Sequence, residues 1–292
     1  MHRFLFAALA SVATIGITLV ASAADMPTKA PMYTKAPPPA PAHGWTGFYG
    51  GLNGGYGWGS ASGDIVSSDP VTSFGLAGAL SFTPPFASSF RQSGGIVGAQ
   101  AGYNWQLSGN TIAGLETDIQ YAHVSGSESH VTYDDASIFG TSFPLIVNAR
   151  RTLDWFGTIR GRLGFLATPN WLIYGTGGLA YGGTTASGSI TLAPPSGVGD
   201  ILNANCQATG PAAVTCYAGS NSRTSVGWTA GAGFEYVIFG NVTAKIEYLH
   251  IDLGGQVATL ASPTVPGVFI GYGYNHEKVD VLRAGLNYRF GN

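Results

Sequence analysis

Charged side chains are scarce in this 292-residue chain, at 10% of the residues against roughly 25% in an average soluble protein. A soluble surface needs more charge than this to remain hydrated. The 13 basic residues nearly balance the 15 acidic ones, so there is no excess of positive charge to attract nucleic acid. The composition therefore argues against a soluble enzyme, and we expect no nucleic-acid partner.

Long apolar runs are also scarce. One covers residues 4–20, between a short basic start and an A-x-A pattern at 21–23, which is the layout of a secretory signal peptide. We expect residues 1–23 to be a cleaved signal peptide; a retained membrane helix is the alternative, because the run is nearly long enough to span. No later segment has 18 uninterrupted apolar residues. Only a closed β-barrel would therefore let the exported chain cross a bilayer.

Cysteine is limited to Cys206 and Cys216. In an exported chain, two cysteines ten residues apart predict one disulfide, which would brace an exposed loop. Two reactive thiols are the alternative interpretation.

Patterns typical of catalytic or metal sites are also lacking. The serines show no spacing specific to a nucleophile, and the histidines near one predicted rim show no metal-ligand spacing. These histidines are His123, His130, His250 and His276. We therefore predict no catalytic residues, no metal and no cofactor, with a lipid-modifying enzyme at the barrel rim as a minor alternative.

Glycine and aromatic residues, by contrast, are abundant. The stretch at 45–59, WTGFYGGLNGGYGWG, has seven glycines and five aromatic residues among its fifteen positions. Glycine disfavours a helix, and exposed tryptophan and tyrosine invite aggregation of a soluble strand. A strand that faces lipid fits both residue types. Tryptophan and tyrosine are favoured at membrane interfaces, and glycine on the inner face lets a narrow barrel close.

Alternating apolar and polar residues predict eight strands. They lie at 45–59, 92–107, 111–124, 151–166, 171–183, 223–237, 242–253 and 277–290. Their connections alternate between a few residues, such as SGN at 108–110 and TPN at 168–170, and long polar loops. The predicted long loops cover 59–91, 125–150, 184–222 and 254–276.

This layout predicts an all-β fold, an eight-stranded antiparallel transmembrane β-barrel with an up-and-down meander, long extracellular loops and short periplasmic turns. The barrel would cover residues 45–292. The proline- and alanine-rich residues 24–44 would form a flexible periplasmic linker. Docking of the linker to peptidoglycan or periplasmic proteins is the alternative to a plain tether.

The predicted inner face of this barrel carries five acidic and five basic side chains. They are Glu116, Asp118, Asp154, Glu235, Glu247, Arg160, Arg162, Lys245, Arg283 and Arg289. Eight strands leave room for side chains and little for water, and buried charges must be paired. We expect a charge network that fills the lumen and fixes the strand register. A charged, water-lined constriction is the alternative.

Several motifs resemble a known family. They are WTGFYGGLNGGYGWG (45–59), WFGTIRGRLGF (155–165), VGWTAGAGFEY (226–236), KIEYLHIDLG (245–254) and VLRAGLNYRF (281–290). Together they are similar to the small alphaproteobacterial outer-membrane β-barrels, the porin-like surface immunogens of brucellae and rhizobia, with an OmpA-like transmembrane barrel. The resemblance implies a monomeric protein of the Gram-negative outer membrane, in contact with its lipid and lipopolysaccharide.

The resemblance also implies a C-terminal signal for the barrel-assembly machinery. Tyr288 and Phe290 match its aromatic pattern, although Gly291 and Asn292 follow where the family usually ends. The function expected from the whole sequence is a structural one, supporting envelope integrity and presenting surface loops. A narrow porin for passive diffusion of small hydrophilic solutes or ions is the alternative.

Overall fold

A computed structural model describes residues 44–68, 88–136, 141–192 and 212–290 of the chain. The predicted signal peptide, the linker up to residue 43 and Cys206 lie outside these ranges. Among the described residues, no helix is both long and apolar enough to cross a membrane.

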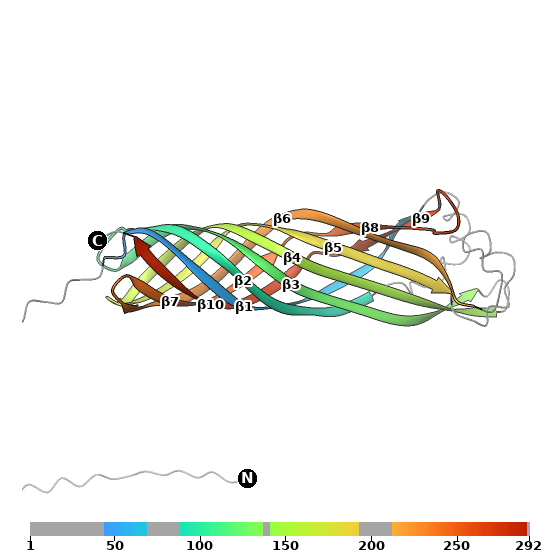
Figure 1. The fold of residues 1–292 in the computed structure, drawn as a ribbon, viewed down its shortest axis with the longest axis horizontal. Coiled ribbons are helices and arrows are strands. Elements are labelled where there is room, and N and C mark those ends of the chain that lie inside the picture. The colour runs from blue at the N-terminus through green and yellow to red at the C-terminus, as the bar shows by residue number, and fades with distance from the viewer. Residues whose placement is uncertain (1–43, 69–87, 137–140, 193–211, 291–292) are drawn as a thin grey trace, which may run out of the picture. The chain divides into compact units, whose positions relative to one another are not determined.

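The described ranges contain one antiparallel sheet of ten strands. The strands are β1 Gly47–Ser68, β2 Ser88–Gln106, β3 Thr111–Ala136, β4 Thr141–Thr168, β5 Trp171–Leu192, β6 Val214–Phe239, β7 Val242–Asp252, β8 Gln256–Ala261, β9 Phe269–Tyr274 and β10 Lys278–Phe290. The strands are inclined to the long axis of the sheet, as Figure 1 shows.

The sheet closes on itself because the last strand pairs with the first. The β1–β10 ladder runs from Phe48↔Phe290 to Ser60↔Lys278, and β10 pairs with β7 on its other side. Strands β1 to β7 follow one another in a meander, so β1–β7 and β10 form a ring of eight. This arrangement confirms the predicted eight-stranded antiparallel barrel.

Three short turns lie together at one end of the barrel, which we name the turn end. They cover residues 107–110, 169–170 and 240–241, close to the predicted positions. Gly240 has a φ of 50°, in the left-handed region that favours glycine in tight turns. The opposite end, toward which β1, β3 and β5 run, is named the loop end (Figure 1).

The four predicted long loops are wrong in extent, because much of each is strand. β3 and β4 have 26 and 28 residues, whereas a membrane crossing needs about 9–11. The predicted loop 254–276 contains the β8–β9 hairpin. β9 continues the pairing with β1, from Gly63↔Tyr274, and β8 meets β6 at Ala218↔Ala261. The hairpin thus occupies, toward the loop end, the place of β7 and β10.

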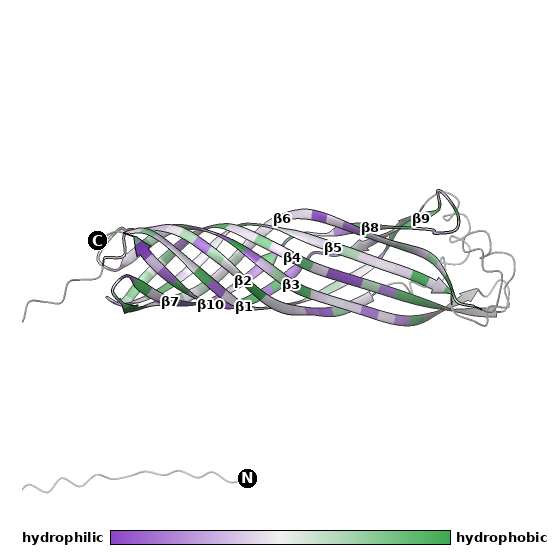
Figure 2. Cartoon of the chain, in the orientation of Figure 1, coloured by the Kyte–Doolittle hydropathy of each residue, from purple (hydrophilic) through white to green (hydrophobic). Residues whose placement is uncertain are grey.

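The outer wall of the eight-stranded ring carries a belt of exposed apolar side chains. Exposed residues of this apolar belt include Phe48, Leu52, Tyr56, Leu115, Ile119, Ile159, Leu163, Ile173, Leu179, Val226, Ile246, Leu282 and Leu286. Aromatic side chains mark its edges: Trp105, Trp171 and Phe290 toward the turn end, Trp58, Trp228 and Tyr248 toward the loop end. Such aromatic girdles are typical of membrane interfaces. In Figure 2, green residues and purple residues both occur along these strands, separated by pale ones.

Toward the loop end the polarity of the wall is inverted. There the interior holds a buried apolar cluster that includes Leu145, Val147, Ile190, Leu260 and Ile270. Apolar side chains therefore cover the outer wall along the belt, whereas toward the loop end they lie mainly in the interior. This inversion explains why the loop-end parts of the strands do not show the sequence pattern that predicts membrane strands.

We expect Gly51→Ala to destabilise the barrel by about 1–3 kcal/mol. Gly51 faces the lumen, and an added Cβ would meet the Asn287 side chain and the Leu286 backbone oxygen. Gly54 is the matched control, because its nearest neighbour, the Ile96 oxygen, would lie 3.6 Å from the added Cβ. Urea unfolding in lipid vesicles measures both variants. Equal stability of the two would contradict close packing at the inner face of β1.

Candidate functional site

The interior of the barrel is layered, and β4 passes every layer as it runs from the loop end to the turn end. Leu145 belongs to the loop-end apolar cluster, Arg151 to a small polar layer, and Phe156 to a second apolar layer. Arg160 then lies among the lumen charges, and Leu166 belongs to an apolar cluster at the turn end. The charged layer is therefore enclosed between two apolar layers.

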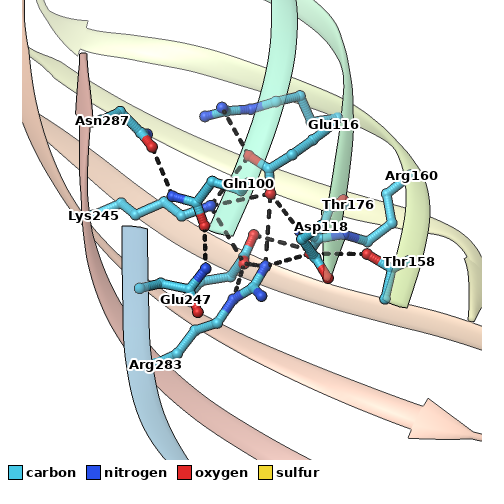
Figure 3. Close-up of polar contacts among 12 residues, drawn as sticks. Gln100, Glu116, Asp118, Thr158, Arg160, Thr176, Lys245, Glu247, Arg283 and Asn287 are labelled. Carbon is cyan, nitrogen blue, oxygen red and sulfur yellow. Dashed lines mark hydrogen bonds and ion pairs between the residues drawn. The ribbon is translucent and has the colours of Figure 1, made fainter. Parts of the chain in front are cut away.

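Four carboxylates and four basic groups meet in the charged layer, here named the lumen charge network. Its members are Glu116, Asp118, Glu235, Glu247, Arg160, Arg162, Lys245 and Arg283. They come from β3, β4, β6, β7 and β10, and each is at most 4% exposed. Figure 3 labels Glu116, Asp118, Arg160, Lys245, Glu247 and Arg283 of this network, whose side chains point toward one another.

Arg160 and Arg283 form the centre of this network by sharing three carboxylates. Both guanidinium groups contact Asp118 Oδ2, at 3.0 Å and 2.9 Å, and both contact Glu247, at 3.1 Å and 2.6 Å. Arg160 also pairs with Glu116, and Arg283 lies 3.6 Å from the same carboxylate. Because these residues belong to four different strands, their contacts link opposite sides of the wall (Figure 3).

Glu116 and Lys245 connect the centre to the turn-end side of the network. Lys245 Nζ lies 3.0 Å and 3.1 Å from the two Glu116 oxygens. Tyr49 of β1 donates its hydroxyl proton to Glu116 Oε2 at 2.7 Å. Glu116 therefore accepts hydrogen bonds from both a cation and a phenol.

Arg162 is held by an acid and by aromatic rings. Its Nη2 lies 2.9 Å from Glu235 Oε2, and its guanidinium carbon lies 4.0 Å from the Tyr174 ring centroid. Glu235 also accepts from the Thr243 hydroxyl and, at 2.9 Å, from Asn287 Nδ2. Arg162 therefore combines an ion pair with a cation–π contact, which suits a planar guanidinium.

The network is balanced in charge and rich in mutual contacts. Burying a charge costs several kcal/mol unless it is paired and hydrogen-bonded, and removing one partner of a buried pair costs about 3–5 kcal/mol. The arrangement is suited to holding strands in one register. It leaves none of its eight members without an ionic partner.

An apolar layer lies in the lumen on the loop-end side of the network. Its buried residues are Ile96, Ala122, Val124, Leu153, Phe156, Ala180, Leu249, Ile251, Leu253, Val279 and Val281. They come from β2, β3, β4, β5, β7 and β10 and from the residue that follows β7. On β1, Gly57 approaches Val124, Val279 and Val281. The layer thus draws members from six of the eight ring strands, with Gly57 of β1 beside it.

A second ion pair, not foreseen from the sequence, lies beyond the apolar layer. Arg151 Nε pairs with Glu277, both side chains are fully buried, and Gln92 donates to Glu277. Arg151 Nη1 also donates to the backbone oxygen of Asn275 at 2.8 Å. Both residues lie at the edges of predicted strands, where alternation does not reveal the face. Their burial follows from the β8–β9 hairpin, which continues the wall.

Asp154, one of the ten predicted lumen charges, lies outside the network. The β4–β5 register shifts between Leu153 and Trp155, so Leu153 and Phe156 are both buried. Asp154 is partly exposed and accepts a hydrogen bond from Thr185 Oγ1 at 2.9 Å. A β-bulge explains the error, because one extra residue reverses the face of all that precede it.

Arg289 also stands apart from the eight, at the turn end. It donates to the Gly44 oxygen, and its guanidinium carbon lies 5.3 Å from the Trp45 ring centroid. Trp45 itself is fully buried and donates from Nε1 to the Pro169 oxygen at 3.0 Å. The start of the described chain thus fills the turn-end mouth of the lumen.

The remaining predicted features lie on the wall or outside the described residues. Tyr288 and Phe290 are exposed on β10 with ring centroids 5.1 Å apart, and their role as an assembly signal stays a prediction. Cys216 is buried on β6; because Cys206 falls outside the described ranges, the disulfide also stays a prediction.

Two of the four rim histidines pair closely with aspartates. His250 Nδ1 lies 2.8 Å from Asp280, and His276 Nδ1 lies 2.9 Å from Asp252. Within the described ranges, no serine hydroxyl hydrogen-bonds to either of these rings. Asp280 Oδ1 also accepts a hydrogen bond from the Tyr248 hydroxyl at 2.7 Å.

Comparisons with known proteins agree with this architecture. The family model for the outer membrane protein β-barrel domain matches residues 17–290. The 31 kDa outer-membrane immunogenic protein of Brucella melitensis is 36% identical over 97% of this chain and 96% of its own length. The 22 kDa outer membrane protein of Rhizobium leguminosarum is 29% identical over 74% and 67%. The resemblance seen in the sequence motifs is therefore confirmed.

Among solved structures, the outer membrane protein OprG from Pseudomonas aeruginosa is similar over 85% of this chain and 99% of its own. The identity is 12% and the TM-score is 0.42.

We expect Arg160→Met to lower the free energy of unfolding by about 3–5 kcal/mol. The substitution keeps much of the side-chain length but leaves Asp118, Glu116 and Glu247 with one cation fewer. Asp154→Asn is the control and should stay within about 0.5 kcal/mol, since Asp154 lies outside the network. Urea unfolding in lipid vesicles gives both values. A similar loss in the two variants would contradict a stabilising network.

We expect Arg151→Met to make the protein less stable at pH 8 than at pH 5. Burial raises the pKa of the Glu277 carboxyl above its ordinary value, and Arg151 opposes this rise. With Arg151 removed, the folded state binds the Glu277 proton more tightly than the unfolded state does. That stabilisation is present at low pH and is lost as the pH rises from the ordinary carboxyl pKa through the raised one.

The control for this pH effect is Arg151→Met combined with Glu277→Gln. The double variant has no carboxyl at the site, so it should regain most of the stability and lose the extra pH dependence. Urea midpoints at the two pH values measure both effects. An identical pH profile in the single and double variants would show that Glu277 does not titrate as argued.

Proposed function

The chain belongs to the outer membrane protein β-barrel domain family and resides in the outer membrane, and from that premise we propose that it is a closed structural barrel. In this proposal it supports the envelope and carries an extension of the wall outside the cell. The extension consists of the β8–β9 hairpin and the loop-end parts of β1 to β6. The observation that carries the proposal is the apolar layer across the lumen, next to a charge network whose members are paired with one another.

A porin would need a continuous wet path, and the layers argue against one. Water and ions avoid a narrow apolar constriction, because dewetting closes it. The lumen charges could guide ions only if they were free to face water, whereas each contacts an opposite charge. Trp45 adds a further obstruction at the turn-end mouth. A narrow diffusion pore is therefore the second candidate.

A non-enzymatic role is part of the same proposal. A lipid-modifying site would need a nucleophile beside a base at the rim. The close imidazole pairs of His250 and His276 are with Asp280 and Asp252, which supports a structural role for these two histidines.

The orientation that we propose places the loop end outside the cell and the turn end in the periplasm. Outer-membrane barrels have their short turns in the periplasm, and the described chain begins at the turn end. Residues 1–23 would be the signal peptide, and 24–44 the periplasmic linker, a tether or a docking segment for peptidoglycan. The exposed Tyr288 and Phe290 would be read by the barrel-assembly machinery.

The apolar belt supports contact with membrane lipid, and we propose a monomer embedded through it. A Cys206–Cys216 disulfide would brace the wall of the extension by roughly 2–3 kcal/mol.

Conductance of the refolded protein in a planar bilayer tests the proposal. We expect no steady conductance from the wild type. The double variant Leu153→Ser, Phe156→Ser replaces two large members of the apolar layer with small polar residues and should conduct if it folds. Trp45→Ala alone should remain silent, because the apolar layer persists. Steady, ion-selective conductance of the wild type would favour the porin.

A further inference from the structure

The ring of the barrel has one seam between strands that lie far apart in the sequence. β1 and β10 are its first and last strands, and their ladder begins at Phe48↔Phe290. Each of the other neighbours in the ring follows its partner along the chain, with the β8–β9 hairpin between β7 and β10. Contacts of large sequence separation form late, because the chain between them must be ordered first. The seam is therefore the pair that we expect to form last and to open first.

The three described residues before β1 turn into the mouth of the barrel beside this seam. Gly47 has a φ of 142°, a backbone conformation that residues with a side chain rarely adopt, and it allows the chain to leave the line of β1. Trp45 lies fully buried in the apolar cluster of the turn end, which includes Ile112, Leu166 and Val237. The chain that leads into β1 is thus anchored inside the lumen.

The groups that hold Trp45 come from separate strands and turns. Its indole N–H donates to the backbone oxygen of Pro169, in the β4–β5 turn, at 3.0 Å. Its backbone N–H donates to Gln106 Oε1 of β2 at 3.3 Å. The guanidinium carbon of Arg289 on β10 lies 5.3 Å from the indole ring centroid, and the same side chain donates to the Gly44 oxygen. This binding site is complete only when β2, β4, β5 and β10 stand in the closed ring.

Arg289 connects the last strand both to the residues before β1 and to a neighbouring turn. Its backbone N–H donates to the Asn241 oxygen at 3.0 Å, in the turn between β6 and β7. Its side chain contacts Gly44 and the Trp45 ring. Opening the seam at this end would separate Arg289 from Gly44 and draw Trp45 out of its apolar cluster. Both changes cost free energy, because they expose apolar surface and break a hydrogen bond to a charged group.

We propose that Trp45 and Arg289 form a latch that keeps the β1–β10 seam closed, here named the turn-end latch. The latch engages after the ring has closed, because its binding site is incomplete until β10 is in place. It therefore acts on the lifetime of the folded barrel and not on the rate at which the barrel forms. The inference rests on the turn-end contacts alone and holds whether or not the lumen conducts.

Folding and unfolding rates test this order of events. The refolded protein in lipid vesicles is transferred into or out of urea, and the folded fraction is followed by its mobility in gels run without heating. We expect Trp45→Ala to unfold on the order of a hundredfold faster, because a large buried side chain is lost, and to fold within about twofold of the wild-type rate. A folding rate that falls by as much as the unfolding rate rises would overturn the proposal, since the latch would then form before closure.

A second variant shows whether the two residues act together. Arg289→Gln removes the guanidinium group from Gly44 and from the indole ring, and it should unfold about tenfold faster than wild type. The variant with both substitutions should unfold at nearly the rate of Trp45→Ala alone, because the contribution of each residue depends on the other. If the two factors multiply instead, the residues act independently and do not form a latch.

An engineered disulfide shows where the barrel opens. Gly54 lies opposite Ala284 of β10 and opposite Val97 of β2, and directly opposed strand residues have the Cα separation that a disulfide needs. In a background without the native cysteines, Gly54→Cys with Ala284→Cys closes the seam, and Gly54→Cys with Val97→Cys is the matched control. Trp45→Ala should no longer speed unfolding of the oxidised seam variant and should still speed unfolding of the oxidised control. An undiminished effect in both would overturn the proposal.

Discussion

The structure depends on closure of the backbone ladder between β1 and β10. In hydrocarbon, an unpaired peptide group costs several kcal/mol, so a sheet can span only if its first and last strands pair. The ladder from Phe48↔Phe290 to Ser60↔Lys278 meets this requirement along the apolar belt. Once the ring is closed with eight strands, the lumen is narrow, and its content must be side chains. The layered interior follows from that geometry.

The strands around the narrow lumen must pair in one register, and the ion pairs of the charge network favour that register. A shift of one residue in β4 would turn Arg160 and Arg162 toward lipid, leave Glu235 of β6 without its ion-pair partner and take at least one cation from the carboxylates of β3 and β7. A shift of two residues keeps the faces, and there the apolar layers discriminate less sharply, because Leu249 or Val281 would find another apolar neighbour. The charge network is thus the part of the core that distinguishes one register from the next.

The membrane part of the fold could be predicted from the sequence because lipid and lumen impose opposite polarity on successive residues. The lipid face and the lumen face are already distinguished by adjacent residues of opposite polarity, such as Leu115 and Glu116 or Ile246 and Glu247. Short turns such as Pro169–Asn170 are equally clear. Eight of the ten predicted lumen charges meet in one network for this reason.

The loop-end part could not be predicted, because its strands carry apolar residues on the inner face, as in a water-exposed sheet, whereas membrane strands carry them on the outer face. The sequence of the β8–β9 hairpin therefore predicts a loop. Asp154 was misplaced because a bulge leaves no local sign in an alternating pattern. The Arg151–Glu277 pair depends on the path of that hairpin, which only the folded wall reveals.

The inversion of polarity along the barrel has a consequence for how the chain can change over time. Outward positions of the apolar belt are constrained by lipid, and lumen positions by charge pairing. Outward positions of the extension, such as Ser129 on β3 or Thr259 on β8, need only remain hydrated. The water-exposed face of the extension can therefore diversify in sequence while the interior, and with it the fold, stays the same.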